Sequence, residues 1–165
     1  MRMVDKPSIE EVTHRSVTPQ DFYHLYSRWN PLIIYNRQDL NPRGEKTLLE
    51  SKDLNKQYQI FHCGSCLVGA PKNLVGDYTR ADAIQAAQVM ARIIYKKFDW
   101  LGVEFEGNEL MASAAWVQFQ RLMQTDQQEK KESKALDILY TPTQQVLRTL
   151  YLYLPDYKYA PLLSP

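Results

Sequence analysis

The segment His62-Cys63-Gly64-Ser65-Cys66 holds the residue types of this chain that are best suited to chemistry. A Cys-x-x-Cys pair beside a histidine matches the ligands of a zinc site or the thiols of a redox pair. A structural zinc site needs a fourth ligand and normally a second paired motif, which the sequence lacks. A thioredoxin-like dithiol would begin a helix, whereas Cys66 leads into another apolar run. The pattern favours a strand–turn–strand with Gly64-Ser65 at its tip, and we expect neither metal nor cofactor.

Three short segments between a predicted strand and a predicted helix hold the other candidates for a ligand site. Loops at the carboxyl ends of parallel strands run into helix N-termini, which attract phosphates and carboxylates. We therefore interpret these loops as one ligand-binding rim, made of Asp77, Thr79, Arg80, Glu106, Gly107, Asn108, Tyr140, Thr141 and Thr143. The alternative is that the threonines only cap helices and Gly107 only permits a tight turn, which is the commoner role of such residues. Glu106 also disfavours a second anion in this crevice.

Basic and aromatic side chains alternate near both ends of the chain, a mixture that can contact phosphates and stack on bases. The candidates for contact with nucleic acid or a protein partner are Arg28, Trp29, Arg37, Tyr157, Lys158 and Tyr159. The alternative is that the aromatic rings fill the core, or that an exposed tyrosine-rich tail docks on a protein. The 20 basic and 19 acidic residues give a net charge of +1, which argues against a general polyanion-binding coat but leaves room for a local basic patch.

Catalytic patterns are missing from the sequence. It has no Gly-x-Ser-x-Gly motif, no glycine-rich phosphate loop and no zinc deaminase signature. Glu104 and Asp137 would face each other on neighbouring strands, but strand alternation more simply points such a carboxylate to solvent or to a basic partner. We therefore expect a binding domain rather than an enzyme.

The elements that must position these residues follow from apolar spacing and turn signals. Residues 1–17 are interpreted as a flexible arm, 18–154 as a single domain and 155–165 as a tail rich in tyrosine and proline. A helix is predicted from Thr18 to just before Pro31. Short strands follow with connections too short for crossovers, which predicts antiparallel pairing, at residues 32–35, 47–49, 58–61 and 66–68.

The second half alternates strand and helix three times. Strands are predicted at residues 74–75, 100–105 and 136–140, and helices begin at Thr79, after Gly107-Asn108 and at Thr141-Pro142. The polar residues 124–134 are interpreted as a solvated loop or a helix extension. Right-handed crossovers would make the three strands parallel neighbours. The predicted fold class is α/β, with α+β as the alternative: a three-strand parallel βαβαβα section with antiparallel strands added from the N-terminal half.

Targeting signals are not evident. The N-terminal residues lack an apolar signal-peptide core, and no apolar run approaches the ~18 residues that span a bilayer. We expect a cytoplasmic protein that does not associate with membranes, unless a secretion system translocates it.

Four stretches of the second half form a recognisable pattern. They are the alanine-rich run 83–91, Phe98-Asp-Trp100-Leu-Gly-Val-Glu-Phe-Glu-Gly107-Asn108, Ala115-Trp116, and Leu139-Tyr-Thr-Pro-Thr143. Over about residues 57–150 the pattern resembles the seventh type of large polyvalent-protein-associated domain, which occurs in bacterial mobile elements beside relaxases and primases. This chain departs from the family pattern in carrying Asp99-Trp100 for Gly-Trp and Gly107-Asn108 for Gly-Ser.

The resemblance implies a non-catalytic accessory domain of conjugative DNA processing or transfer, which binds DNA, a relaxase or a secretion-system protein. It supplies no catalytic residues. Two alternatives remain open on the residues alone. One is an exported effector or regulator that binds a protein partner, and the other is an enzyme that acts on a nucleotide or phosphate ligand at the strand ends.

Overall fold

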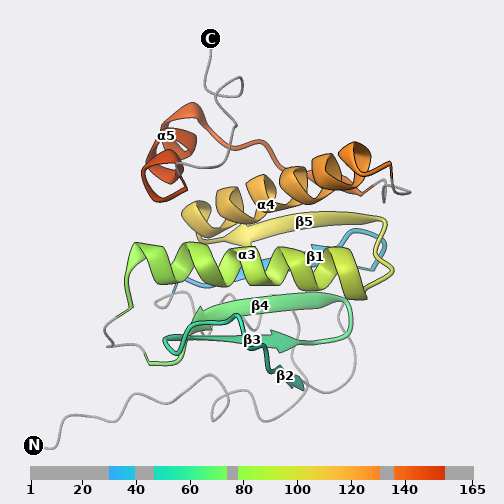
Figure 1. The fold of residues 1–165 in the computed structure, drawn as a ribbon. Coiled ribbons are helices and arrows are strands. Elements are labelled where there is room, and N and C mark those ends of the chain that lie inside the picture. Colours follow the sequence, from blue (N-terminus) through green and yellow to red (C-terminus); the bar gives the residue numbers. More distant parts are fainter. Residues whose placement is uncertain (1–29, 40–46, 74–77, 131–135, 155–165) are drawn as a thin grey trace, which may run out of the picture.

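The computed structural model describes residues 30–39, 47–73, 78–130 and 136–154. Within them a six-stranded mixed sheet carries two helices, α3 (Arg80–Lys97) and α4 (Glu109–Gln128), on one face (Figure 1). A third helix, α5 (Gln144–Tyr153), packs against α4. The predicted mixture of helices and a mixed sheet is confirmed. The predicted arm, the helix before Pro31 and the tail lie outside the described residues.

The sheet has the strand order β2-β3-β4-β1-β5-β6, and every neighbouring pair is antiparallel except β5 and β6. In chain order the strands are β1 (Leu32–Asn36), β2 (Thr47–Leu49), β3 (Tyr58–His62), β4 (Cys66–Pro71), β5 (Gly102–Gly107) and β6 (Asp137–Leu139). The strands predicted in the first half are therefore present, and they pair as antiparallel neighbours as expected.

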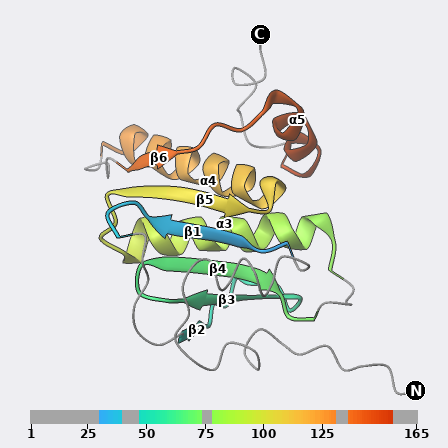
Figure 2. The same cartoon turned by 180° about the vertical axis from the view of Figure 1, so that it is seen from behind.

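The expected run of three adjacent parallel strands holds only for β5 and β6. Strand β1 lies between β4 and β5 and is antiparallel to both, pairing Tyr35 with Cys66 on one side and with Glu104 on the other (Figure 2). Strands β4, β5 and β6 therefore run in one direction, and each is followed by a helix. The strand predicted at residues 74–75 lies outside the described residues. Among the described strands, β4 is the one that precedes α3 in the chain.

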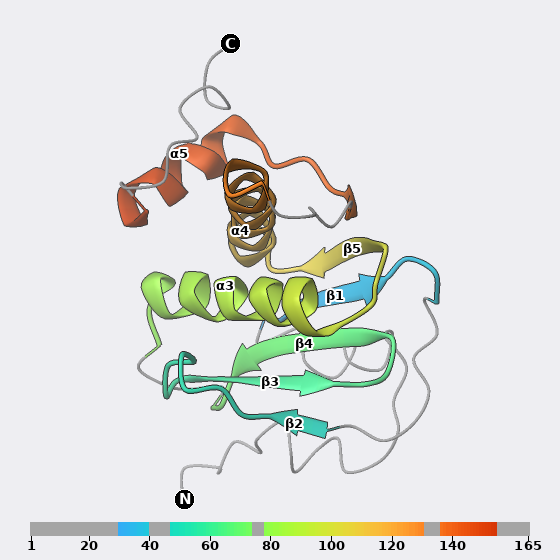
Figure 3. The ribbon, with the colours of Figure 1, turned by 45° about the vertical axis from the view of Figure 1, so that its right-hand side comes forward.

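Helix α3 begins where the sequence predicts it, with Thr79 as its N-cap. Thr79 accepts a hydrogen bond from the Asp82 backbone N–H, and the Asp82 carboxylate accepts one from the Thr79 N–H, which completes a capping box. The absence of a side chain at Gly69 of β4 makes room for Met90 of this helix, because a Cβ atom at Gly69 would stand 2.4 Å from the Met90 sulfur. The buried residues of this helix, among them Ala83, Ala87 and Ala91 of the alanine-rich run, face the sheet and α4 (Figure 3).

The other two helices differ slightly from the prediction. Helix α5 begins at Gln144 with Thr143 as its N-cap, so the start predicted at Thr141-Pro142 is two residues early. The reason is local, because it is the Thr143 side chain that accepts a hydrogen bond from the Val146 N–H, while Pro142 is buried ahead of the cap. Of the polar stretch 124–134, residues up to Gln128 extend α4. Among the described residues, none of the helices combines the length and the apolar character that a membrane crossing requires.

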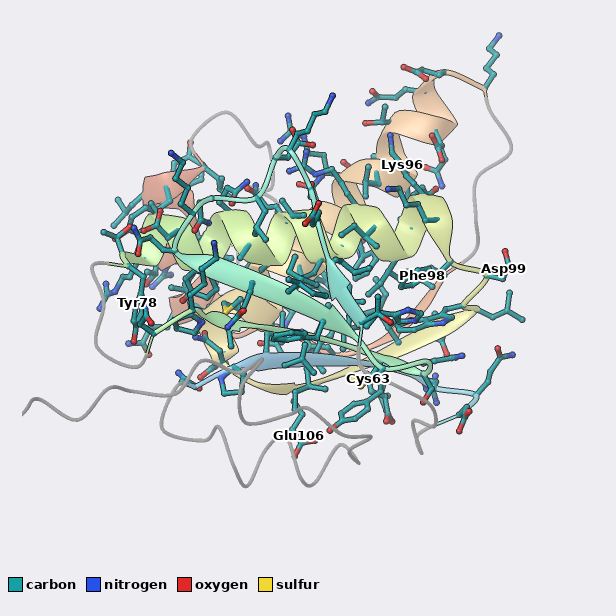
Figure 4. The ribbon with its side chains drawn as sticks, turned by 90° about the horizontal axis from the view of Figure 1, so that it is seen from below. Cys63, Tyr78, Lys96, Phe98, Asp99 and Glu106 are labelled. Atoms are coloured by element: carbon teal, nitrogen blue, oxygen red, sulfur yellow. The ribbon has the colours of Figure 1, made fainter. Side chains whose placement is uncertain are left out.

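Strand alternation divides the buried residues between the two faces of the sheet. The main core lies between the sheet and helices α3, α4 and α5. On the opposite face, called here the second face, a smaller buried cluster comprises Ile33, Tyr35, Phe61, Cys63, Cys66, Val68 and Ala70. No helix of the described residues packs over the second face, where Cys63 and Glu106 point away from α3 (Figure 4).

Candidate functional site

The N-terminal parts of α3 and α4 meet the side of α5 at one end of the molecule. Arg80, Glu109, Leu110, Val146 and Thr149 line a cavity there with a volume of about 230 Å³. The structure thus brings the starts of α3 and α4 against α5 (Figure 1), and of the described residues of the predicted rim Arg80 alone lines this cavity. A cation and a carboxylate share the cavity, so its charge is mixed.

Three of the predicted rim residues cap helices with their side chains. Their oxygens accept hydrogen bonds from backbone N–H groups one turn into each helix: Thr79 from Asp82 at 3.2 Å, Asn108 from Met111 at 2.9 Å and Thr143 from Val146 at 3.2 Å. These bonds satisfy donors that a helix start leaves without partners. The alternative that threonines cap these helices therefore holds for Thr79, whereas at α5 the capping residue is Thr143 and not Thr141.

Gly107 is a conformational requirement rather than a ligand-binding group. Its backbone φ is +101°, and a Cβ atom would stand 2.0 Å from the carbonyl oxygen of Pro31. The next residue, Asn108, donates its backbone N–H to that same carbonyl at 2.9 Å, and its side-chain amide to the carbonyl of Asn30 at 3.2 Å. This junction fixes the end of β5 against the start of β1.

Tyr140 connects the end of β6 to α4. Its hydroxyl and that of Ser113 form a 2.8 Å hydrogen bond, and its ring packs on Phe105 with centroids 5.1 Å apart. Burial raises the pKa of Tyr140, and the hydrogen bond with Ser113 opposes that rise. The neighbouring Thr141 is exposed.

Glu106 lies on the second face. The hydroxyl of Tyr35 donates a hydrogen bond to the Glu106 carboxylate across the β1–β5 pair. Burial, then this hydrogen bond and the carboxylate charge, raise the pKa of Tyr35 well above its ordinary value. Glu106 is thus directed to the opposite face of the sheet from α3 and α4, and does not share the cavity of Arg80.

Arg37 forms an ion pair with Asp137 at the far ends of β5 and β6. The predicted basic partner of Asp137 is therefore Arg37. Asp137 and Glu104 do not face each other, because Asp137 pairs with Gly102 across the sheet and Glu104 pairs with Leu139. A cavity of about 380 Å³ lies beside the ion pair. The remaining candidates lie outside the described residues: Asp77, Arg28, Trp29, Tyr157, Lys158 and Tyr159.

A group of basic residues near the start of α3 was not predicted from the sequence, except for Arg80. We define the basic end as Lys56, Lys72, Tyr78 and Arg80, all of them exposed. The Lys72 N–H donates to the Gln57 carbonyl at 2.8 Å, and the ring of Tyr78 meets that of Tyr58 edge-on with centroids 5.7 Å apart. Lys56 and Lys72 line a cavity of about 520 Å³. The pairing register of β3 and β4 brings Lys56 and Lys72 to one cavity, and that register could not be read from the sequence.

The Cys-x-x-Cys segment is the predicted strand–turn–strand. The Cys63 N–H donates to the Cys66 carbonyl at 3.0 Å, and Gly64 has a φ of +77° at the tip. His62 points to the opposite face, where its ring stacks on Phe98 with centroids 4.6 Å apart, so it does not join the two sulfurs. Within the described ranges, no group of three or more His, Cys, Asp or Glu side chains is placed to hold a metal ion.

Comparison with known proteins gives no match to a family model, a curated protein or a solved structure. The resemblance described from the sequence therefore stays a prediction.

Proposed function

We propose that this chain is a non-catalytic accessory domain of conjugative DNA processing or transfer, and that it contacts DNA through the basic end. The observation that carries the proposal is that Lys56 and Lys72 line one cavity with Tyr58, whose ring contacts Tyr78, while Arg80 begins the helix that follows Tyr78. The three cations and Tyr78 are exposed, Tyr78 at 37%, and none of the three cations forms an ion pair with a described residue. Such cations contact phosphates, while an exposed aromatic ring stacks on an unpaired base.

The accessory role is supported by the structural contacts of the residues that carry the resemblance. Trp100 is 7% exposed within the core, Gly107 permits the close approach to Pro31, and Tyr140 is hydrogen-bonded to Ser113. These residues hold the junctions between strands and helices. The pattern would then identify a framework that presents a surface, rather than a set of reacting groups.

The charge of the basic end sets the strength of binding that we expect. Three cations allow about three phosphate contacts, so log K should fall with log salt with a slope of roughly −2 on single-stranded DNA. Glu50 lines the cavity of Lys56 and Lys72, Glu109 lines that of Arg80, and both carboxylates reduce the local positive potential. Binding should therefore be moderate at low salt and largely lost at high salt. The stacking contribution of Tyr78 favours single-stranded over double-stranded DNA.

Fluorescence anisotropy with labelled single- and double-stranded oligonucleotides over a salt series tests this proposal. We expect Lys72→Glu/Arg80→Glu to weaken single-strand binding by at least about tenfold, because each reversal removes one phosphate contact and adds a repulsion. The matched control is Lys96→Glu/Lys97→Glu, which makes the same charge change at the opposite end of α3, where Lys96 lies far from Tyr78 (Figure 4). Circular dichroism verifies that both variants are folded.

Two results would reject DNA binding at the basic end. One is the absence of binding to either DNA at low salt, and the other is an equal loss in the two double variants, which would indicate a response to net charge alone. Retention of a purified relaxase or secretion-system protein by the immobilised chain would then support the protein-binding form of the accessory role.

A further inference from the structure

Cys63 and Cys66 lie opposite each other at the closed end of the β3–β4 hairpin, on the second face. The register pairs His62 with Leu67, so the next facing pair is Cys63 with Cys66. The Cys63 N–H donates to the Cys66 carbonyl at 3.0 Å, and both side chains belong to the buried cluster of the second face. Facing residues of an antiparallel pair have Cα atoms about 5.5 Å apart, which is inside the range that a disulfide spans.

We propose that Cys63 and Cys66 are a redox modification site that forms a reversible intramolecular disulfide with a low-molecular-weight disulfide, such as oxidised glutathione, as oxidant. The hairpin register already places both side chains on the same face, so the bond forms without a change of strand pairing. Both cysteines are thiols in this structure. The inference does not depend on the proposed function, because the cysteines lie outside the basic end.

Cys63 is the attacking thiol. It adjoins the exposed Gly64 and is less deeply buried than Cys66, which follows the buried Ser65, while the neighbouring Cys63 thiol and burial raise the pKa of Cys66. The Cys63 thiolate attacks one sulfur of the oxidant, forms a mixed disulfide and breaks the oxidant's own S–S bond. The first glutathione leaves as a thiolate and takes up the proton that Cys63 released.

Cys66 completes the exchange. After losing its proton, its sulfur attacks the Cys63 sulfur of the mixed disulfide, forms the Cys63–Cys66 bond and releases the second glutathione, which takes up that proton. The two cysteine sulfurs are oxidised and the two sulfurs of the oxidant are reduced, so one molecule of oxidised glutathione yields two molecules of reduced glutathione.

Burial determines how the reaction should be measured. Cys63 is 2% exposed and Cys66 0%, whereas Gly64 at the tip of the turn is exposed. Attack therefore requires a local opening of the turn, and slow kinetics are expected. The informative quantity is the equilibrium between dithiol and disulfide, approached from both directions.

The full chain is equilibrated with a series of reduced-to-oxidised glutathione ratios, quenched with acid, alkylated and analysed by peptide mass spectrometry. We expect native protein to lose two hydrogens per chain and both alkylation sites as the ratio falls, and to recover both thiols on return to reduced glutathione. Oxidation should raise the melting temperature of the wild-type chain and leave that of Cys63→Ala/Cys66→Ala unchanged.

Single variants test the order of attack. Cys66→Ala should accumulate glutathione on Cys63, since no second thiol resolves the mixed disulfide, and Cys63→Ala should acquire severalfold less. The proposal is overturned if folded wild-type protein keeps both alkylation sites at equilibrium with oxidised glutathione while the urea-unfolded chain is oxidised. Exclusive formation of disulfide-linked dimers would overturn it as well.

Discussion

The backbone of Gly107 lies against that of Pro31, so closely that a Cβ atom on Gly107 would stand 2.0 Å from the Pro31 carbonyl oxygen. The same carbonyl accepts the backbone N–H of Asn108, which caps α4. Leu32, the next residue along from Pro31, pairs with Gly107 in the sheet. One peptide unit therefore fixes the start of β1, the end of β5 and the start of α4.

Replacing Gly107 by alanine should destabilise the fold strongly. The new methyl group would overlap a backbone atom that cannot rotate away, and the φ of +101° is itself costly for an L-residue. We expect a loss of about 3 kcal/mol or more in the free energy of unfolding, measured by urea denaturation. Gly102→Ala is the control, because the nearest atoms to its Cβ would lie at 3.2 Å and one of them is in the flexible side chain of Arg37. Equal losses in the two variants would contradict this account.

The Thr79 cap should contribute about 1 kcal/mol to stability. Its hydroxyl oxygen accepts the Asp82 N–H at 3.2 Å, and alanine would leave that N–H to water. We expect Thr79→Ala to lose about that amount, and Thr79→Ser, which keeps the oxygen, to lose only a small part of it. Urea unfolding monitored by helix circular dichroism measures both. A serine variant as unstable as the alanine variant would show that the methyl group matters and the cap does not.

Tyr140 and Ser113 should be energetically coupled. Ser113 is fully buried, so Tyr140→Phe leaves its hydroxyl without this partner and should cost about 1–2 kcal/mol. Ser113→Ala/Tyr140→Phe should be no less stable than Tyr140→Phe alone, because the stranded hydroxyl is then gone. A double-mutant cycle by urea denaturation gives the coupling free energy. Strict additivity of the two losses would exclude the coupling.

Alkaline conditions should destabilise the chain through Tyr58. Burial, followed by the charges of Tyr78 and Asp82, raises the pKa of Tyr58 above its ordinary value near 10. Below about pH 10 both states keep the proton, so the pKa shift leaves stability unchanged there. At higher pH the unfolded chain ionises while folded Tyr58 stays protonated, so this residue should lower the free energy of unfolding by about 1.4 kcal/mol per pH unit.

Tyr58→Phe removes that contribution and should flatten the alkaline slope. Urea unfolding at about pH 8 and at several values above pH 10 compares the two chains. Some slope should remain, because the pKa values of Tyr35 and Tyr140 are raised as well. Parallel slopes for the wild type and the variant would contradict the raised pKa of Tyr58.

Local signals in the sequence predicted the elements well. The Thr79 cap placed the start of α3, and the Gly64-Ser65 tip placed the β3–β4 hairpin. These features depend on neighbouring residues, so their energetics are visible in a short window. The strand predicted at 100–105 is found at 102–107, a two-residue shift that reflects the weaker boundary signals of strands.

Long-range pairing was not predictable in the same way. The insertion of β1 between β4 and β5 joins Leu32 to Gly107, and apolar alternation reveals that a strand is buried without revealing its neighbours. The basic end was missed for the same reason, because Lys56 and Lys72 meet only through the register of β3 and β4. Arg80 was found because it belongs to a helix start, which sequence does reveal.

The central position of β1 decides how the chain can be divided. A polypeptide that begins at residue 57, where the resemblance begins, would carry the β3–β4 hairpin and the β5–β6 pair with no strand between them, and only the helices would connect the two pairs. Each part would expose a strand edge with unpaired N–H and C=O groups, to which an extended peptide can add as a further strand. A ten-residue segment spanning 30–39 is thus the natural complement of such a fragment, and truncation boundaries for this protein belong upstream of Asn30.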